Sequence, residues 1–254
     1  MRALLISLLL LPCLMMGQTD AGYPVFENGM ITAQPGKIQQ FEAGMAAHNK
    51  KYHSAGPYGA RVYWISNGKN VGKYMWVMGP LPWAALDQRP ADEGHDADWN
   101  TNVLPYATAE GDQTYWRFHP DLSGFPTDFT LKYLKVMMMD IAPFKDQQFF
   151  GMLQKVKKVM AAKHPNAFYG MYTNELPSSE DGRDFAFVDF FDSMSFMGQE
   201  DTFMADFEAV HGAGSFLTFM EEMQSAIAGV QSEIWIFRED LSGLNGNVAA
   251  ASRQ

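Results

Sequence analysis

Two histidines, His48 and His95, are the side chains of this 254-residue chain best suited to chemistry near neutral pH. His48 lies on a stripe with Phe41, Met45 and Tyr52, whose spacing places all four on one face of a helix. A neutral imidazole can bind a metal ion, or accept and return a proton. A histidine on an otherwise apolar face is therefore a candidate functional residue, although a hydrogen-bonded core histidine would give the same pattern.

Four tryptophans belong to the same half of the chain as the two histidines. Trp76, Trp83, Trp99 and Trp116 could form the aromatic walls of one cavity, which suits a planar or apolar ligand. A joint site requires both imidazole rings to face that cavity and to lie within about 12 Å of each other. The candidate ligand-binding residues are therefore His48, His95, Trp76, Trp99, Trp116 and Tyr52.

Carboxylates close to His95 could complete a set of polar groups. Asp92, Asp96 and Asp98 lie within three residues of it. The same acidic stretch would also suit a solvated loop or the start of a helix, because negative charge is stabilised at a helix N-terminus. Both interpretations stay open at this point.

No stretch of the chain carries a specific catalytic or cofactor-binding motif. A nucleophile elbow, a phosphate-cradling glycine loop, a dinucleotide fingerprint and a metalloprotease helix are all missing from the sequence. The remaining histidines fall near the ends of predicted elements and are expected to be exposed: His53, His119, His164 and His211. We therefore assign no metal ligands, leave the cofactor unknown and leave open whether the protein is an enzyme.

The elements that must position these residues come from an internal repeat. Residues 35–41 and 143–149 share Pro, Lys, Gln, Gln and Phe in register, 108 residues apart. Four further matched blocks follow in the same order, namely 58–59 with 169–170, 74–77 with 185–188, 97–99 with 205–207, and 116–118 with 235–237. Five blocks in one order indicate a duplicated structural unit.

Each copy predicts the element order β-α-β-β-α-β. A strand, a helix opened by proline, a hairpin, a second helix and a closing strand follow one another in both halves. The predicted organisation is a first ferredoxin-like unit over 24–119, a linker over 120–128, a second unit over 129–240 and a flexible tail over 241–254.

The repeat also serves as an internal control on the candidate residues. His48 corresponds to Val156 in the second copy, and His95 corresponds to Phe203. Where both copies agree, a residue is expected to serve the shared fold. Because the first copy alone is polar at these two positions, we expect any functional site to lie there.

A four-stranded sheet with both helices on one face leaves its other face bare, and the second copy can cover it. This arrangement resembles the dimeric α+β barrel superfamily, which contains antibiotic-biosynthesis-type monooxygenases, haem-degrading relatives and many small binding proteins. The resemblance covers roughly residues 24–240 and rests on topology. It implies an α+β fold in which two tandem ferredoxin-like units pack sheet to sheet as a pseudo-dimeric barrel, and it transfers no catalytic residue.

The first seventeen residues have the pattern of an export signal. Arg2 precedes an uninterrupted apolar run over 3–11, which is too short to span a bilayer. Cleavage after Gly17 would remove Cys13, the only cysteine, and with it any disulfide or thiolate metal site. We therefore expect an exported protein, periplasmic or extracellular, with no membrane association after cleavage. The alternative is a buried N-terminal segment.

Charge and composition narrow the classes of partner. A net charge of −10 repels phosphate backbones, so nucleic acid is not an expected partner. The chain is 47% hydrophobic, which is enough to build a core without disulfides. We expect a protein that binds a small apolar or aromatic ligand. The alternatives are a cofactor-independent monooxygenase-like enzyme and a structural protein without a pocket. Fusion of two copies makes a monomer or a homodimer the expected state.

Overall fold

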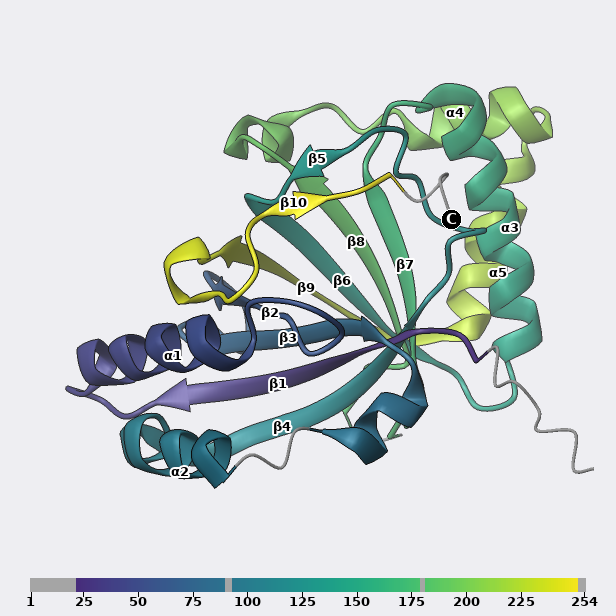
Figure 1. The fold of residues 1–254 in the computed structure, drawn as a ribbon. Helices are drawn as coiled ribbons and strands as arrows, with labels where there is room; N and C mark the ends of the chain where they lie inside the picture. The colour runs from purple at the N-terminus through teal and green to yellow at the C-terminus, as the bar shows by residue number, and fades with distance from the viewer. Residues whose placement is uncertain (1–21, 90–92, 179–180, 251–254) are drawn as a thin grey trace, which may run out of the picture.

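The computed structural model describes residues 22–89, 93–178 and 181–250, and within them two units follow each other along the chain (Figure 1). The predicted export signal therefore lies outside the described residues. The first unit consists of β1 (Val25–Ala33), α1 (Ile38–Tyr52), β2 (Ala60–Ile65), β3 (Tyr74–Leu81), α2 (Glu93–Asn102) and β4 (Ala107–Phe118). The second consists of β6 (Tyr133–Ile141), α3 (Asp146–Lys163), β7 (Tyr169–Asn174), β8 (Phe185–Phe191), α4 (Phe203–His211), α5 (Ser215–Ala226) and β9 (Ile227–Phe237).

The two four-stranded sheets join along both edges into one closed barrel. The strand order around it is β1-β3-β2-β9-β6-β8-β7-β4, so each unit has the ferredoxin-like order and the units meet at β2–β9 and β4–β7. The chain therefore has the α+β fold of two tandem ferredoxin-like units expected from the repeat. Closure pairs every strand edge of the two sheets, which removes the exposed edges that a lone unit would have.

Alternation along the strands separates an inner apolar core from two outer ones. In β6, Leu134, Val136 and Met138 face the barrel interior, whereas Met139 packs under the helices of the second unit. Helices α1 and α2 cover the outside of the first sheet, and α3, α4 and α5 cover the outside of the second (Figure 1). Each unit thus has a separate space between its sheet and its helices.

Helix α1 buries the face that its sequence predicts. Phe41, Met45, His48 and Asn49 are its buried residues, at the spacing of one helical face. Gly44 allows α1 to lie directly against the end of α2, because a Cβ at that position would come within 1.8 Å of the carbonyl oxygen of Asn102. The close contact of these two helices fixes the side chains that both direct toward the sheet.

The predicted flexible tail is wrong for residues 241–250, which are packed against the barrel. Leu241 is buried in the core between α1 and the sheet, and β10 (Asn247–Val248) pairs with β5 (Phe129–Thr130). The Nδ2 of Asn49 donates a hydrogen bond of 2.7 Å to the carbonyl of Leu241. The segment therefore braces the end of α1, and its order comes from these tertiary contacts, not from its own composition.

Two other differences concern element lengths. Strands β4 and β9 begin at Ala107 and Ile227, well before the short closing strands that the sequence indicates, because the pairing of their first halves with β1 and β6 outweighs weak strand propensity. The second helical region of the second unit is divided into α4 and α5 around Gly212 and Gly214. Within the described residues, no helix combines the length and hydrophobicity needed to cross a bilayer.

Candidate functional site

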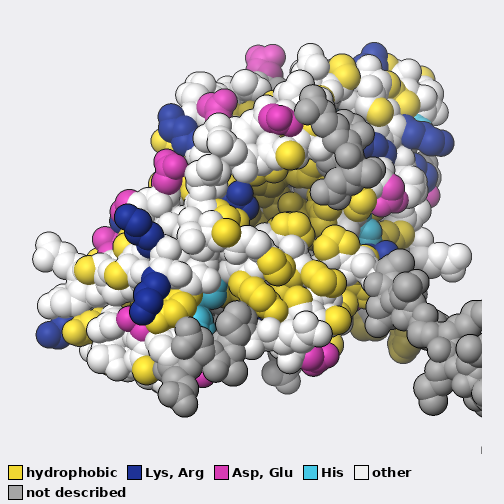
Figure 2. Space-filling model, in the orientation of Figure 1, with side chains coloured by type: hydrophobic (Ala, Val, Ile, Leu, Met, Phe, Trp, Pro, Cys, Tyr) yellow, Lys and Arg dark blue, Asp and Glu magenta, His cyan; other side chains and the backbone are white. Residues whose placement is uncertain are grey.

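A cavity of about 370 Å³ lies between the outer face of the first sheet and its covering helices. Its apolar walls are formed by Ile31, Trp76, Met78 and Trp99. Polar side chains reach it from α1, α2 and the neighbouring strands: Glu27, His48, Tyr52, His53, Tyr58, Arg89, His95, Asp96 and Gln113. In Figure 2, histidine side chains are visible at the molecular surface beside hydrophobic ones, so this cavity opens to the outside.

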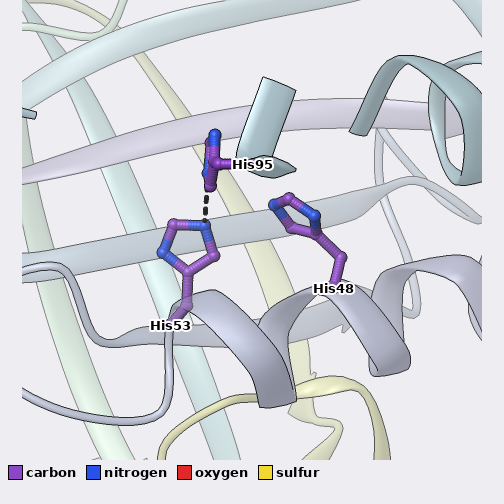
Figure 3. Close-up of side chains that lie close together, drawn as sticks. All are labelled: His48, His53 and His95. Atoms are coloured by element: carbon purple, nitrogen blue, oxygen red, sulfur yellow. Dashed lines mark hydrogen bonds between the residues drawn. The ribbon is translucent and has the colours of Figure 1, made fainter. Parts of the chain in front are cut away.

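Three imidazole rings converge in this cavity (Figure 3). His48 comes from the last turns of α1, His53 directly follows the end of that helix, and His95 lies in the first turn of α2. The ring centroids of His48 and His95 are 4.8 Å apart, and His53 lies 5.2 Å and 5.3 Å from these two. The expectation that His48 and His95 face one cavity is confirmed, and a third ring joins them.

The Nδ1 atom of each ring is held by an oxygen that can only accept a hydrogen bond. His48 donates to a carboxylate oxygen of Asp98 at 2.8 Å, and His95 donates to Asp96 at 2.8 Å. His53 donates to the backbone carbonyl of Tyr58 at 2.7 Å. Because each neutral ring carries one hydrogen, placed here on Nδ1, all three Nε2 atoms present lone pairs.

These three Nε2 atoms have few partners of their own. The Nε2 atoms of His53 and His95 lie 3.2 Å apart and face each other. The Nε2 of His48 is buried and has no hydrogen-bond partner among the described residues, and the hydroxyl of Tyr52 is in the same condition. Buried polar atoms without partners are rare in folded proteins and mark a place where another molecule or ion belongs.

Burial keeps two of the rings neutral. It lowers the pKa of His53 to about 4, because the charged ring would lose its hydration. Burial also lowers the pKa of His48, against the opposing hydrogen bond to Asp98, and that bond in turn holds the pKa of Asp98 below its usual range. The cavity therefore contains neutral imidazoles beside an ionised carboxylate at pH 7.

A buried carboxylate forms another polar part of the wall. Glu27 on β1 is 4% exposed, and its pKa is raised by burial even though the guanidinium of Arg89 donates a hydrogen bond to it. Gln113 on β4 donates a second hydrogen bond of 2.9 Å to Glu27. Glu27 thus has the features of an acid that can hold a proton close to a bound molecule.

The predicted site residues divide between two places. His48, His95, Trp76, Trp99 and Tyr52 line the cavity together. The placement of Trp116 there is wrong: its ring faces the barrel interior, and its indole donates to Thr114.

The reason is strand parity. On β1 and β4 successive side chains alternate between the helix side and the interior, and Trp116 pairs with Phe26 on the interior side. Trp83 also lies outside the cavity lining and packs against Tyr115. Of the candidate carboxylates, Asp96 and Asp98 orient histidines, and Asp92 lies outside the described residues.

His53 is the residue that the sequence interpretation missed. It was expected to be exposed, but it is 7% exposed and packs edge-on against Trp76. A signal did exist: His53 and His164 both directly follow the first helix of their unit. Agreement between the copies suggested a shared structural role, and that role conceals the second one that His53 has in the first unit.

The corresponding space in the second unit is filled. Val156 and Phe203, which occupy the positions of His48 and His95, pack into a core with Phe207 and Phe219. His164 pairs instead with Asp206, on the helix that corresponds to α2. The polar cavity therefore belongs to one unit only.

The barrel interior contains a second, smaller hollow of about 110 Å³. It is lined almost wholly by hydrophobic side chains from both sheets, with Arg183 at its margin. Arg183 forms ion pairs of 2.8 Å with Asp112 and with Asp181, so its charge is already matched. This hollow lacks the converging, unpartnered polar atoms of the first cavity.

Comparison with known proteins shows the fold and stops there. No protein-family model matches the chain, and no curated protein matches it. A proposed monooxygenase from Lactobacillus acidophilus NCFM superposes with a TM-score of 0.53 at 13% identity, over 90% of this chain and 99% of that one.

Two further solved structures agree. A mutant chlorite dismutase from Candidatus Nitrospira defluvii gives a TM-score of 0.52 at 9% identity, over 87% of this chain and 94% of that one. An anthrone oxidase-like protein gives 0.51 at 11%, over 86% and 93%. The chain therefore has the tandem ferredoxin-like fold of the dimeric α+β barrels, and at these identities the likeness shows the fold alone.

Proposed function

We propose that the protein binds a small molecule with a planar or apolar body in the cavity of the first unit. The observation that carries this proposal is the convergence of three imidazoles between aromatic walls, with the buried Nε2 of His48 unpartnered. A cavity of about 370 Å³ lies within the range of small-molecule sites. The absence of any comparable polar group from the second unit supports a dedicated role for the first.

The side chains of the cavity define what such a molecule would offer. Trp76 and Trp99 favour a flat or apolar body, which they can contact with their ring faces. The lone pairs on Nε2 of His48 and His53 favour hydroxyl or amine hydrogens that point toward them. A phenol or a similar hydroxylated aromatic compound combines both properties.

An enzymatic role is the second candidate, in the manner of a monooxygenase that uses no cofactor. One observation favours it: Glu27, whose pKa burial raises, lines the same cavity as the neutral imidazoles. Together they could remove a proton from a bound phenol and return it elsewhere. A purely structural protein is disfavoured by the presence of the cavity.

Mass spectrometry of the native protein, purified from its own source, tests whether a ligand is retained. A matched variant places the residues of the second unit into the first: His48→Val with His95→Phe should fill the cavity with apolar atoms. We expect the retained ligand to be lost from this double variant and kept by Val188→Ile, which changes only the barrel interior. Retention by the double variant would place the ligand elsewhere, and no ligand in either form would contradict the proposal.

We also propose that the protein is exported and acts outside the cytoplasm, as a monomer or a homodimer. The first seventeen residues support export by their pattern alone. Both seams of the barrel close within one chain, which supports a monomer. Sequencing the mature N-terminus of cell-free fractions tests the first point, and light scattering of the purified protein tests the second. A mature chain that begins at Met1 would contradict export by this route.

A further inference from the structure

We infer that His48, His53 and His95 form a binding site for one divalent transition-metal ion of the zinc class, through their Nε2 atoms. The ligand atoms of these three residues all lie within 4.8 Å of one another. The site shares the cavity of the proposed function, but it does not require the small molecule. The fourth coordination position would be open to the cavity, as in catalytic rather than structural metal sites.

The first argument is the fixed orientation of each ring. Metal-binding histidines usually donate their second ring hydrogen to a carboxylate or a backbone carbonyl, which sets the tautomer and aims the free nitrogen at the metal. All three residues have this arrangement: Asp98 holds His48, Asp96 holds His95, and the carbonyl of Tyr58 holds His53. Chance would seldom give three neighbouring histidines the same outer contact.

The second argument is the contact between His53 and His95. With both hydrogens on Nδ1, two lone pairs face each other across 3.2 Å, which is repulsive unless a cation lies between them. Tetrahedral ligands at about 2.0–2.1 Å from zinc are roughly 3.3 Å apart, which is close to the observed separation. A shared proton is the other cation that could occupy this place, and the experiment below separates the two.

The third argument is the buried third ligand. His48 is 1% exposed, and its Nε2 has no hydrogen-bond partner among the described residues. Its ring lies 4.8 Å from that of His95, so a small movement of either side chain closes the set. An uncompensated polar atom at this depth costs free energy, and coordination of a metal ion removes that cost.

The chemistry of the ligands selects the ion. Three neutral imidazoles suit Zn²⁺, Co²⁺, Ni²⁺, Cu²⁺ or Fe²⁺, whereas Mg²⁺ and Ca²⁺ prefer oxygen ligands. The second unit provides a contrast, since His164 there pairs with Asp206 and the positions of the other two histidines are Val156 and Phe203. One ion per chain is therefore expected.

The test uses full-length mature protein without a histidine tag, stripped with a chelator and titrated with Co²⁺. We expect saturation at one Co²⁺ per chain, visible absorption bands of a four- or five-coordinate ion, and displacement by one equivalent of Zn²⁺ counted by elemental mass spectrometry. A proton shared by His53 and His95 would give no such bands and no stoichiometric uptake, and that outcome would overturn the inference.

The variants His48→Gln, His53→Gln and His95→Gln should each weaken Co²⁺ binding by 100-fold or more. His164→Gln is the matched control, because it removes a histidine that also follows a first helix, and it should bind as the parent does. Circular dichroism of each variant shows whether it is folded. If a folded His53→Gln variant bound Co²⁺ as tightly as the His164→Gln control, the assignment would be wrong.

Asp98 is a positioning residue in this account, and Asp98→Asn tests it. Loss of the carboxylate should weaken Co²⁺ binding by about 10–100-fold while the absorption bands keep their shape, because the three ligands remain. A variant that changes stability alone would leave the affinity unchanged. Small-molecule retention is measured separately on metal-loaded and metal-free protein, so failure of the metal site and failure of the proposed function give different results.

Discussion

The close contact between α1 and α2 makes Gly44 a sensitive position, and Gly44→Ala is the most direct test of the site geometry. A Cβ there would lie 1.8 Å from the carbonyl oxygen of Asn102 and 2.8 Å from its carbonyl carbon. The two helices must separate by more than about 1 Å before this contact reaches an ordinary van der Waals distance. Such a movement would stretch the 2.8 Å hydrogen bond between His48 and Asp98 beyond useful length.

The expected change in stability combines two opposing effects. Alanine in place of a helical glycine gains about 1 kcal/mol of helix propensity, whereas overpacking costs about 1–3 kcal/mol. We expect Gly44→Ala to lower the free energy of unfolding by about 1 kcal/mol, which corresponds to a fall in Tm of roughly 2–4 °C. Co²⁺ affinity should fall with it, because His48 comes from α1 and His95 from α2.

Gly151 in α3 is the matched control. A Cβ at that position meets no atom within 4 Å, so Gly151→Ala gains helix propensity without a clash and should raise the free energy of unfolding by up to about 1 kcal/mol. Thermal unfolding of both variants, with Co²⁺ titration of each, measures the contrast. If Gly44→Ala were as stabilising as Gly151→Ala and kept full affinity, the helix contact described above would be refuted.

Two further outcomes concern the scaffold. Burial raises the pKa of Asp189 to about 6 despite its cross-strand neighbour Lys135, whereas the unfolded value is about 4. The folded state therefore binds a proton more tightly than the unfolded one, and this group's contribution to stability is lost as pH rises from about 4 to 6. Asp189→Asn should remove that loss, so urea unfolding should show its advantage over the parent growing to at most about 3 kcal/mol by pH 7, and an equal advantage at pH 4 and pH 7 would contradict it. Leu241→Ala should lower the free energy of unfolding by about 2–4 kcal/mol, because Leu241 is 2% exposed in the core beneath α1, and a loss below about 0.5 kcal/mol would show that the segment after β9 is loosely held.

The fold could be predicted from the sequence because the repeat determines it at several levels at once. Matched blocks place each strand and helix, and a bare sheet face in each copy requires the other copy to cover it. The segment after β9 could not be predicted in this way. Leu241 and Asn247 carry no periodic pattern, and they are ordered by contacts with α1 and β5 that exist only after the barrel forms.

The candidate site was only partly accessible from the sequence. His48 and His95 stand out because the second copy has Val156 and Phe203 in their place, and this departure correctly indicates one cavity. Trp116 was misplaced because a strand alternates between two faces, and a shift of one residue in register exchanges them. His53 escaped notice because its role in ending a helix is common to both copies.

Covalent fusion of the two halves has a consequence for how such a barrel can change over evolutionary time. In a barrel made of two identical chains, every substitution occurs twice, so a histidine that opens a cavity in one half also opens it in the other. Here the two seams, β2–β9 and β4–β7, join halves that are encoded separately. The second half can keep a filled aromatic core and carry the stability of the whole, while the first half is free to accumulate buried polar groups that would be too costly in duplicate.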